Sequence, residues 1–152
     1  MNISDFLSNR DVLIGVSAGD KARLLRQLSL HAANELGLDP NKVSEAIAKR
    51  EALGSTGVGN GVALPHARVS NLKEPYGLLA QLKHSIDFEA VDDQPVDIVF
   101  MLLIPEAADS AQLNALACIA RKLRDPGALR EVRQAVDRES LFEAVTRPSF
   151  IS

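Results

Sequence analysis

The chain has 152 residues, of which 46% are hydrophobic and 24% charged, and its formal net charge is −3. Basic and acidic residues are interspersed along it, which is not the pattern of a nucleic-acid-binding surface, so no nucleic acid is expected as a partner. No apolar run approaches the ~20 residues that span a bilayer, so the protein is not expected to be membrane-embedded.

The beginning of the chain and its cysteine content point to the cytoplasm. Residues 1–6 lack the basic and apolar regions of a secretory signal. Cys118 is the one cysteine of the sequence, which excludes an internal disulfide, and the apolar residues around it predict a buried, inert thiol. We expect a cytoplasmic protein that forms one domain over residues 1–152.

The first third of the chain predicts a strand followed by two helices. Residues 12–16 form a short apolar run typical of a strand. Residues 21–36 show the apolar spacing of a helix, and Gly37 is suited to end it in a left-handed conformation.

The second helix is predicted from its start signal. Asp39 is a capping residue, and Pro40 loses no hydrogen bond at the first helical position. This helix is expected to end at about Gly54. A glycine-rich loop and a brief apolar segment over residues 62–64 then lead to His66.

The remaining chain predicts two strands and then helices. Residues 76–82 are typical of a strand, and residues 96–104 form a near-continuous apolar run, the pattern of a strand covered on both faces. Pro105 stops that run. Strands interleaved with helices indicate an α/β fold with a mixed β-sheet and helices packed on both faces.

Three helices are expected after the second of these strands. Asp109 or Ser110 caps a helix over about residues 111–123. Pro126 starts another helix, and the last one starts at about Ser140.

The segment with the most chemistry is residues 50–68, which read REALGSTGVGNGVALPHAR. His66 is the only obvious nucleophile in it, and Pro65 presents this histidine from a stiff support because its own φ angle is locked. Phosphoryl transfer through a histidine needs one unprotonated ring nitrogen as nucleophile and the other held as a donor. The segment therefore suits the binding and transfer of a small anion.

The same segment supplies groups that bind phosphate oxygens. The hydroxyls of Ser55 and Thr56 are donors, and the guanidinium groups of Arg50 and Arg68 each pair with two oxygens at once. Its glycines let backbone amides approach an anion closely. From the residues alone, a tight turn with an incidental surface histidine is the alternative interpretation.

Nucleotide cofactors are poorly supported. The glycine loop lacks the Gly-Lys-Ser/Thr ending of a P-loop and the spacing of the dinucleotide fingerprint. It also follows a predicted helix, whereas both of those motifs follow a strand. No Gly-x-Ser-x-Gly elbow of a hydrolase is present. We therefore expect no cofactor.

The other polar residues are expected to be structural. The chain has three histidines, and they are too scattered for their spacing to suggest a zinc site, so no metal is expected. His31 lies on the first predicted helix, and His84 is expected in a solvated loop. The acidic residues of 92–97 suit a turn before a strand, with a cation site as the alternative.

The glycine and histidine segment closely resembles the active-site signature of EIIA domains of the bacterial phosphotransferase system, fructose/mannitol type. A second stretch, residues 86–97, resembles the second recognisable block of that family. The resemblance covers roughly residues 5–146 and implies a mixed, mostly parallel sheet with helices on both faces. The matching residues of the signature are Arg50, Glu51, Gly54, Ser55, Thr56, Gly57, Gly59, Gly61, Ala63, Pro65 and His66.

The resemblance also implies roles for individual residues. It makes His66 the phosphorylated residue, through its Nε2 (tele) nitrogen, with Nδ1 held by a backbone acceptor. Arg50 is the implied phosphate partner, and Ser55 and Thr56 shape the pocket. Members of the family commonly have a second histidine near the start of the helix after the long strand. Gln112 is aligned with it here, and this residue cannot carry a positive charge.

Within the family the chain looks most like the free-standing nitrogen-regulatory branch, EIIA-Ntr. This implies a regulatory phosphocarrier that accepts a phosphoryl group from a phosphocarrier protein of the HPr or NPr type and regulates partner proteins by its phosphorylation state. Family analogy suggests potassium transporters and sensor kinases as targets. The alternatives are a sugar-specific EIIA that passes phosphate to an EIIB in fructose or mannitol uptake, and a degenerate member that binds partners without phosphorylation.

Overall fold

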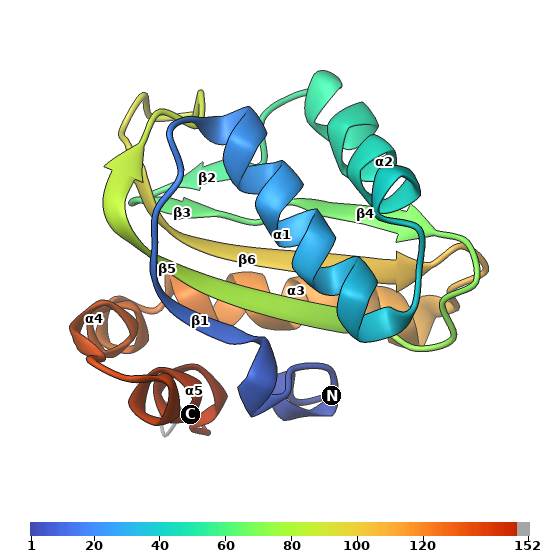
Figure 1. The fold of residues 1–152 in the computed structure, drawn as a ribbon. Helices are drawn as coiled ribbons and strands as arrows, with labels where there is room; N and C mark the ends of the chain where they lie inside the picture. Colours follow the sequence, from blue (N-terminus) through green and yellow to red (C-terminus); the bar gives the residue numbers. More distant parts are fainter. Residues whose placement is uncertain (149–152) are drawn as a thin grey trace.

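A mixed β-sheet runs through the middle of the computed structural model, which describes residues 1–148 (Figure 1). In the described residues its strand order is β1-β5-β6-β3-β2, and β4 also pairs with β6. The β1–β5, β3–β6 and β4–β6 pairs are parallel, whereas β5–β6 and β2–β3 are antiparallel. The strands are β1 (Val12–Val16), β2 (Gly57–Gly59), β3 (Val62–Ala63), β4 (His66–Val69), β5 (Tyr76–Ile86) and β6 (Val96–Pro105).

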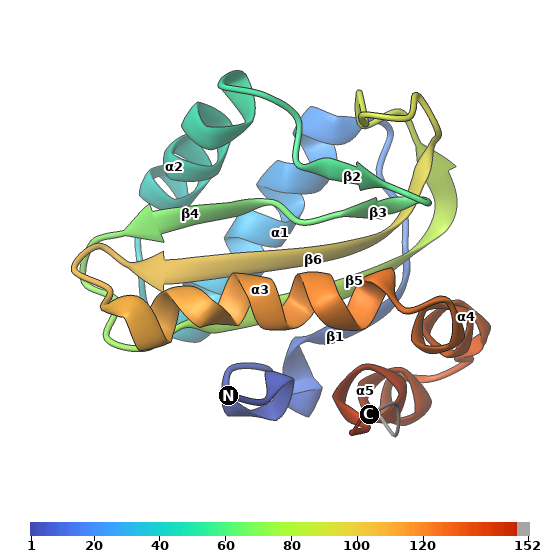
Figure 2. The same ribbon diagram turned by 180° about the vertical axis from the view of Figure 1, so that it is seen from behind.

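Helices cover both faces of this sheet, as Figures 1 and 2 show from opposite sides. α1 (Lys21–Leu36) and α2 (Pro40–Ala52) lie on one face. α3 (Ser110–Arg124) lies on the other, together with α4 (Pro126–Gln134), α5 (Arg138–Thr146) and the short 3₁₀ turns η1 (Ile3–Asp5) and η2 (Asn9–Asp11). The predicted fold class, a mixed and mostly parallel sheet with helices on both faces, is confirmed.

The apolar run of β6 is buried on both sides. Val99, Met101 and Leu103 join the core under α1 and α2. Phe100 and Leu102, which alternate with them, join the core under α3 and α5. Side chains on a strand alternate between faces, so a central strand between two helical layers must be apolar throughout. This explains the continuous apolar run in the sequence.

Local capping signals set the helix ends that the sequence predicts. Gly37 adopts a left-handed φ of 67° after α1, and the Asp39 side chain accepts a hydrogen bond from the Asn41 amide at the start of α2. Asp109 caps α3 by accepting from the Gln112 amide. α5 begins at Arg138, two residues before the expected start at about Ser140, because Asp137 caps it by accepting from the Ser140 amide.

Three further corrections concern strands and burial. Three short strands were not predicted as strands: β2 lies in the expected glycine-rich loop, β3 in the brief apolar segment, and β4 begins at His66. β3 and β4 are strands because they pair with β6. β5 extends to Ile86, so His84 lies on a strand. Cys118 is only partly buried, and its thiol donates to the Met1 carbonyl at 3.4 Å.

In residues 1–148 no helix combines the length and the apolar character needed to cross a membrane.

Candidate functional site

His66 stands where the chain changes strands beside β6. β3 pairs with β6 as far as Ala63, opposite Val99, and β4 resumes the pairing at His66, opposite Leu102. Leu64 and Pro65 fall between the two short strands. The Pro65 carbonyl accepts from the Leu102 amide at 2.9 Å, so the proline is anchored to the central strand immediately before the histidine. The backbone of His66 is therefore fixed from both sides.

The histidine ring has one nitrogen engaged by the backbone. Nδ1 of His66 lies 2.7 Å from the carbonyl oxygen of Leu64. A carbonyl only accepts, so Nδ1 carries the proton in this contact and Nε2 of the neutral ring is left with a free lone pair. This is the tautomer that a nucleophilic Nε2 requires. The structure thus supplies the backbone acceptor that sequence analysis expects for Nδ1.

The ring borders a broad groove of about 1150 Å³ between α2 and β4. α2 contributes Lys49 and Arg50 to its walls, and β4 contributes His66 and Arg68. The groove also contains acidic side chains, so its charge is mixed. Leu113 and Leu116 of α3 line it as well. The family resemblance implies that the start of this helix lies near His66, but no local pattern names these two residues.

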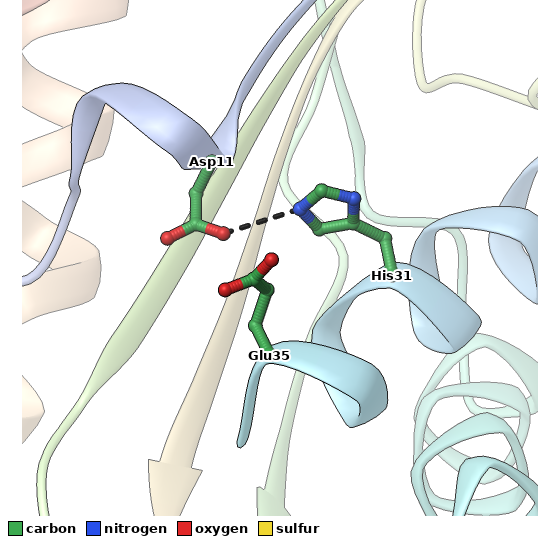
Figure 3. A group of neighbouring side chains, drawn as sticks. All are labelled: Asp11, His31 and Glu35. Atoms are coloured by element: carbon green, nitrogen blue, oxygen red, sulfur yellow. Dashed lines mark hydrogen bonds and ion pairs between the residues drawn. The ribbon is translucent and has the colours of Figure 1, made fainter. Parts of the chain in front are cut away.

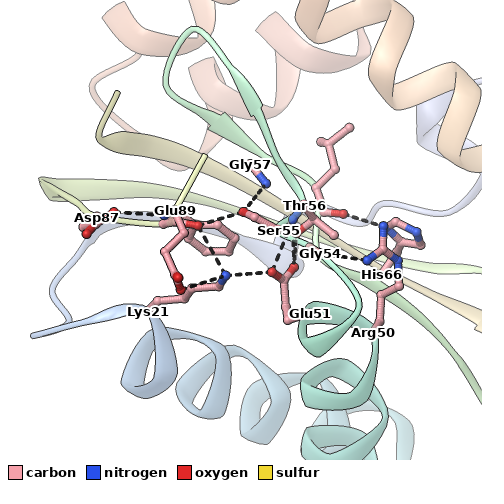
Figure 4. Close-up of polar contacts among 12 residues, drawn as sticks. Lys21, Arg50, Glu51, Gly54, Ser55, Thr56, Gly57, His66, Asp87 and Glu89 are labelled. Atoms are coloured by element: carbon pink, nitrogen blue, oxygen red, sulfur yellow. Dashed lines mark hydrogen bonds and ion pairs between the residues drawn. The ribbon is translucent and has the colours of Figure 1, made fainter. Parts of the chain in front are cut away.

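Arg50 is in the last turn of α2, on the same groove as His66 (Figure 4). Its Nη1 donates to the Gly54 carbonyl at 2.9 Å, and it satisfies a carbonyl just beyond the helix end. The guanidinium has further N–H donors that this bond does not use. Arg50 is thus a preorganised cation at the wall of the groove that His66 borders.

Ser55 and Thr56 are held by other parts of the protein. The Ser55 hydroxyl donates to the Phe88 carbonyl at 2.8 Å and accepts from the Gly57 amide at 3.0 Å. The Thr56 hydroxyl donates to the Glu51 carboxylate, which also accepts from the Thr56 amide. In this structure both hydroxyls shape the loop that precedes His66, and direct contact with a phosphate stays a prediction.

Glu51 links this loop to α1. Its carboxylate is 2.8 Å from the Lys21 ammonium, and the two side chains are only 7% and 17% exposed. Lys21 also donates to the Phe88 carbonyl at 3.3 Å and lies 4.6 Å from the centre of the Phe88 ring. Figure 4 shows these side chains meeting beneath the loop. Because a buried charge is costly unless it is paired, this network holds the loop in one position.

Gln112 lies at the start of α3 and has local partners. Its side-chain carbonyl accepts from the Asp109 amide at 3.2 Å, and its side-chain amide donates to the Lys73 carbonyl at 3.2 Å. The α3 residues that line the groove of His66 are Leu113 and Leu116. Among the described contacts Gln112 therefore supports the helix start, and its role near a phosphate stays a prediction.

The acidic segment 92–97 is a turn that leads into β6, as expected, with Asp92 in the turn and Asp97 on the strand. Asp92 accepts from the backbone amides of Asn60 and Gln94, and these hydrogen bonds, the one from Asn60 foremost, lower the pKa of its carboxyl group. Asp97 is instead paired with Arg133 of α4 at 2.9 Å. The two carboxylates serve separate backbone and ion-pair contacts, and they do not combine into a cation site.

His31 belongs to a different cluster, which joins α1 to η2. Its Nε2 lies 3.2 Å from Asp11 Oδ1, and Glu35 lies close by. The Tyr76 hydroxyl donates to the same Asp11 oxygen at 2.6 Å. Burial first, and then this hydrogen bond, raises the pKa of Tyr76 above its ordinary value. Within residues 1–148 this is the group of side chains that has metal-ligand character.

The chain is similar to known proteins of one family. Residues 5–147 match the family model described as "Phosphoenolpyruvate-dependent sugar phosphotransferase system, EIIA 2". The chain is 39% identical over 148 residues to the nitrogen regulatory protein of Bradyrhizobium diazoefficiens, and the match covers 97% of each protein. It is 37% identical over 147 residues to the nitrogen regulatory protein of Escherichia coli, covering 96% of this chain and 90% of that protein.

Solved structures show the same fold. The nitrogen regulatory protein IIA-Ntr of Neisseria meningitidis superposes with a TM-score of 0.89 at 30% identity, over 95% of this chain and 99% of that one. The IIA mannitol protein of Escherichia coli gives a TM-score of 0.72 at 19% identity, over 91% of this chain and 97% of that one. The second likeness is of the fold alone.

Proposed function

The chain belongs to the EIIA 2 family of the phosphoenolpyruvate-dependent sugar phosphotransferase system, and from this premise we propose that it is a regulatory phosphocarrier of the nitrogen phosphotransferase system. As one EIIA-type domain in the cytoplasm, it receives a phosphoryl group on His66 from the phosphohistidine of a phosphocarrier protein of the HPr or NPr type. The observation that carries the proposal is the 2.7 Å contact between His66 Nδ1 and the Leu64 carbonyl.

The transfer step follows from this tautomer. The Nε2 lone pair of His66 attacks phosphorus in line with the donor's N–P bond, which breaks as the new N–P bond forms. The electron pair of the broken bond returns to the donor imidazole, and His66 Nδ1 keeps its proton throughout. Since Leu64 holds that proton, the ring gains nucleophilicity at Nε2 without a separate base.

Arg50 supplies positive charge to this step. A guanidinium donates to two phosphate oxygens at once, and its charge opposes the negative charge on the transferring group. Its bond to Gly54 keeps the side chain ordered before a donor protein arrives. Ser55 and Thr56 hold the loop that connects Arg50 to His66, so the two groups keep their relative position.

Phosphorylation changes the charge of the groove on which partner proteins would dock. A phosphoryl group adds nearly two negative charges next to Arg50, Lys49 and Arg68. A partner that docks on these basic side chains in the unmodified protein loses that contact, and one that requires an anion gains it. Potassium transporters and sensor kinases are the target classes that the family suggests.

A sugar-specific EIIA is the second candidate. It is favoured by the 30% identity, over 107 residues, to the fructose-specific EIIA component of Haloferax volcanii. An EIIA of that type passes its phosphoryl group to an EIIB. Onward transfer from phosphorylated His66 to an EIIB and then to fructose or mannitol supports this function, and retention of the phosphoryl group supports the regulatory one.

Intact-mass measurement tests the phosphocarrier function directly. The chain is incubated with phosphoenolpyruvate and the two upstream phosphotransferase proteins, beside the variants His66→Ala and His84→Ala. We expect one acid-labile phosphoryl adduct on the parent chain and on His84→Ala, and none on His66→Ala. Absence of an adduct from the parent chain excludes this function and leaves a binding module that acts without phosphorylation.

A further inference from the structure

A second polar cluster lies away from His66, at the junction of η2, α1 and β5. Figure 3 shows the side chains of Asp11, His31 and Glu35 converging from two elements. His31 and Glu35 are four residues apart on α1, which places them on the same face of the helix one turn apart. Asp11 ends η2 and comes from the opposite side. Neither the family signature nor the phosphoryl transfer step uses these residues.

We propose that Asp11, His31 and Glu35 form a binding site for a divalent transition metal of the zinc class. One ligand atom from each of the three lies within 4.8 Å of the others. One imidazole nitrogen and two carboxylate oxygens form a borderline ligand set that suits zinc, whereas calcium and magnesium prefer oxygen ligands alone. Three protein ligands leave the fourth position of a tetrahedral ion for water.

The spacing of the first two ligand atoms is close to that of a zinc site. His31 Nε2 is 3.2 Å from Asp11 Oδ1. Two ligands bound to zinc at tetrahedral angles are separated by about 3.4 Å, from metal–ligand bonds of about 2.1 Å. Glu35 then has to move only its carboxylate, and this side chain is 34% exposed and long enough to turn. Binding therefore replaces the His31–Asp11 hydrogen bond by two bonds to the metal, and the His31 ring and the Glu35 carboxylate turn toward the ion.

The surroundings of Asp11 favour a preformed site. Its side chain is only 3% exposed, and the Tyr76 hydroxyl donates to Oδ1 at 2.6 Å. A carboxylate that ligates a metal is usually oriented by a second hydrogen bond of this kind. His31 is 26% exposed, so an ion can reach the imidazole from solvent. The buried Asp11 is thus held in place, while His31 is accessible to an ion from solvent.

Arg10 provides the counter-charge that an ion would replace. Its Nε lies 3.2 Å from Glu35 Oε2 and 3.9 Å from Asp11 Oδ2, so it neutralises the two carboxylates. The Arg10 side chain is 69% exposed and is free to swing into water. A metal ion and Arg10 thus compete for the same two carboxylates. This competition distinguishes a metal site from a cluster of ion pairs.

Calorimetric titration of the full chain with zinc chloride tests the proposal. We expect one zinc per chain on the parent, and a loss of affinity of at least about tenfold in His31→Ala and in Glu35→Gln. His84→Ala and His66→Ala are the matched controls, because each removes a histidine outside the cluster, and both should bind zinc as the parent does. Arg10→Gln should bind zinc about fivefold more tightly, since it removes the competing cation.

Thermal unfolding with and without zinc tests the same site in variants that are less stable than the parent, because each variant is compared with itself. Because zinc binds only the folded protein, adding it should raise the Tm of the parent and of Arg10→Gln. Adding zinc to His31→Ala should leave the Tm of that variant as it is without zinc. The proposal is overturned if the parent binds no zinc. It is also overturned if His84→Ala or His66→Ala abolishes binding, or if Arg10→Gln weakens it. Those results leave Asp11, His31 and Glu35 as structural ion pairs.

Discussion

The carbonyl oxygen of Leu64 faces Nδ1 of His66 at 2.7 Å, across the proline that separates the two residues. This contact is short because Pro65 has a fixed φ and its carbonyl is bonded to the Leu102 amide of the central strand. A backbone acceptor cannot be removed by changing one side chain. The orientation of the His66 ring is therefore set by the pairing of β3 and β4 with the same strand, β6.

The first prediction concerns the histidine tautomer. In the unphosphorylated protein the neutral His66 ring should carry its proton on Nδ1, because only that nitrogen has an acceptor at hydrogen-bond distance in the described contacts. Long-range ¹H–¹⁵N correlation spectra of the histidine-labelled chain measure this directly, and His66→Ala assigns the signals. A ring proton found on Nε2 contradicts the proposed nucleophile.

The second prediction concerns Arg50. Arg50→Gln should slow phosphorylation of His66 by about tenfold, because a charge-assisted donor to the transferring group is lost. Lys49→Gln removes a charge from the adjacent position of the same groove wall, so it measures the effect of groove charge alone and should slow the reaction less than Arg50→Gln. The rate of adduct formation by the donor phosphocarrier measures the effect. Equal rates for the parent and Arg50→Gln would show that Arg50 does not contribute to the transfer step.

The helix ends were predictable because their causes are local. Gly37 and the adjacent Asp39 and Pro40 act on the residues next to them, so the limits of α1 and α2 follow from the sequence. Strands β2 to β4 are two to four residues long, too short for a periodic pattern. β3 and β4 form because they pair with β6, which lies far away in the chain, so no local signal marks them. β2 pairs instead with β3 across Asn60-Gly61, both at positive φ, and this Asn-Gly dipeptide is a local hairpin signal that the sequence analysis did not use.

The candidate site also has a part that is predictable from the sequence and a part that depends on packing. His66, Pro65 and Arg50 lie in one segment, and their residue types alone suggest the chemistry. The Lys21 partner of Glu51 is 30 positions away, at the start of α1, whereas Glu51 is near the end of α2, so only the packing of α1 on α2 brings the charges together. Sequence reasoning finds the reactive group more readily than the residues that support it.

The third prediction tests how closely the loop before His66 packs. A Cβ atom on Gly57 would lie 2.7 Å from the Ala90 Cβ and 2.9 Å from the Ala90 Cα, so Gly57→Ala forces two backbone segments apart. We expect a loss of about 1–3 kcal/mol in the free energy of unfolding, the usual cost of overpacking. Urea denaturation measures it.

Gly127→Ala is the control for that experiment. The nearest atom to a Cβ at Gly127, an Asp125 carboxylate oxygen, is 3.9 Å away, and the residue is helical. The same substitution there should be neutral or stabilising by about 0.5 kcal/mol. Similar losses in both variants would show that alanine is unfavourable for reasons other than the contact with Ala90.

The fourth prediction is a pH dependence at the start of α5. Hydrogen bonds from the backbone and then the side chain of Ser140 lower the pKa of Asp137 below its ordinary value of 3.8. A carboxyl whose pKa is lowered by folding stabilises the folded state above its unfolded pKa. That contribution is lost as the pH falls from 3.8 through the lowered folded pKa.

Carbon-detected titration of the Asp137 carboxyl should therefore show a midpoint below 3.8, and the Ser140 amide signal should follow it. In Asp137→Asn the helix keeps a capping side chain that does not titrate, so the Ser140 signal should lose this transition. A midpoint at or above 3.8 contradicts the hydrogen bonds in the structure.

The fifth prediction compares two carboxylates that face one ammonium group. Glu51 is 2.8 Å from the Lys21 Nζ with 7% of its side chain exposed, whereas Glu89 is 3.7 Å away with 78% exposed. Glu51→Gln removes the buried partner and also disturbs the bonds from Thr56, so we expect a loss of about 2 kcal/mol in unfolding free energy. Glu89→Gln removes a solvated partner and should cost less than about 0.5 kcal/mol.

Urea denaturation of both variants measures this difference, and hydrogen exchange at the Thr56 amide locates it. In Glu51→Gln that amide should exchange faster, because its acceptor is weakened, while in Glu89→Gln it should exchange as in the parent. Because the Thr56 carbonyl accepts from the Leu64 amide at 2.9 Å, loosening this loop also loosens the residue that orients His66. Slower phosphorylation of Glu51→Gln at an unchanged exchange rate would contradict this route and require a direct role for Glu51.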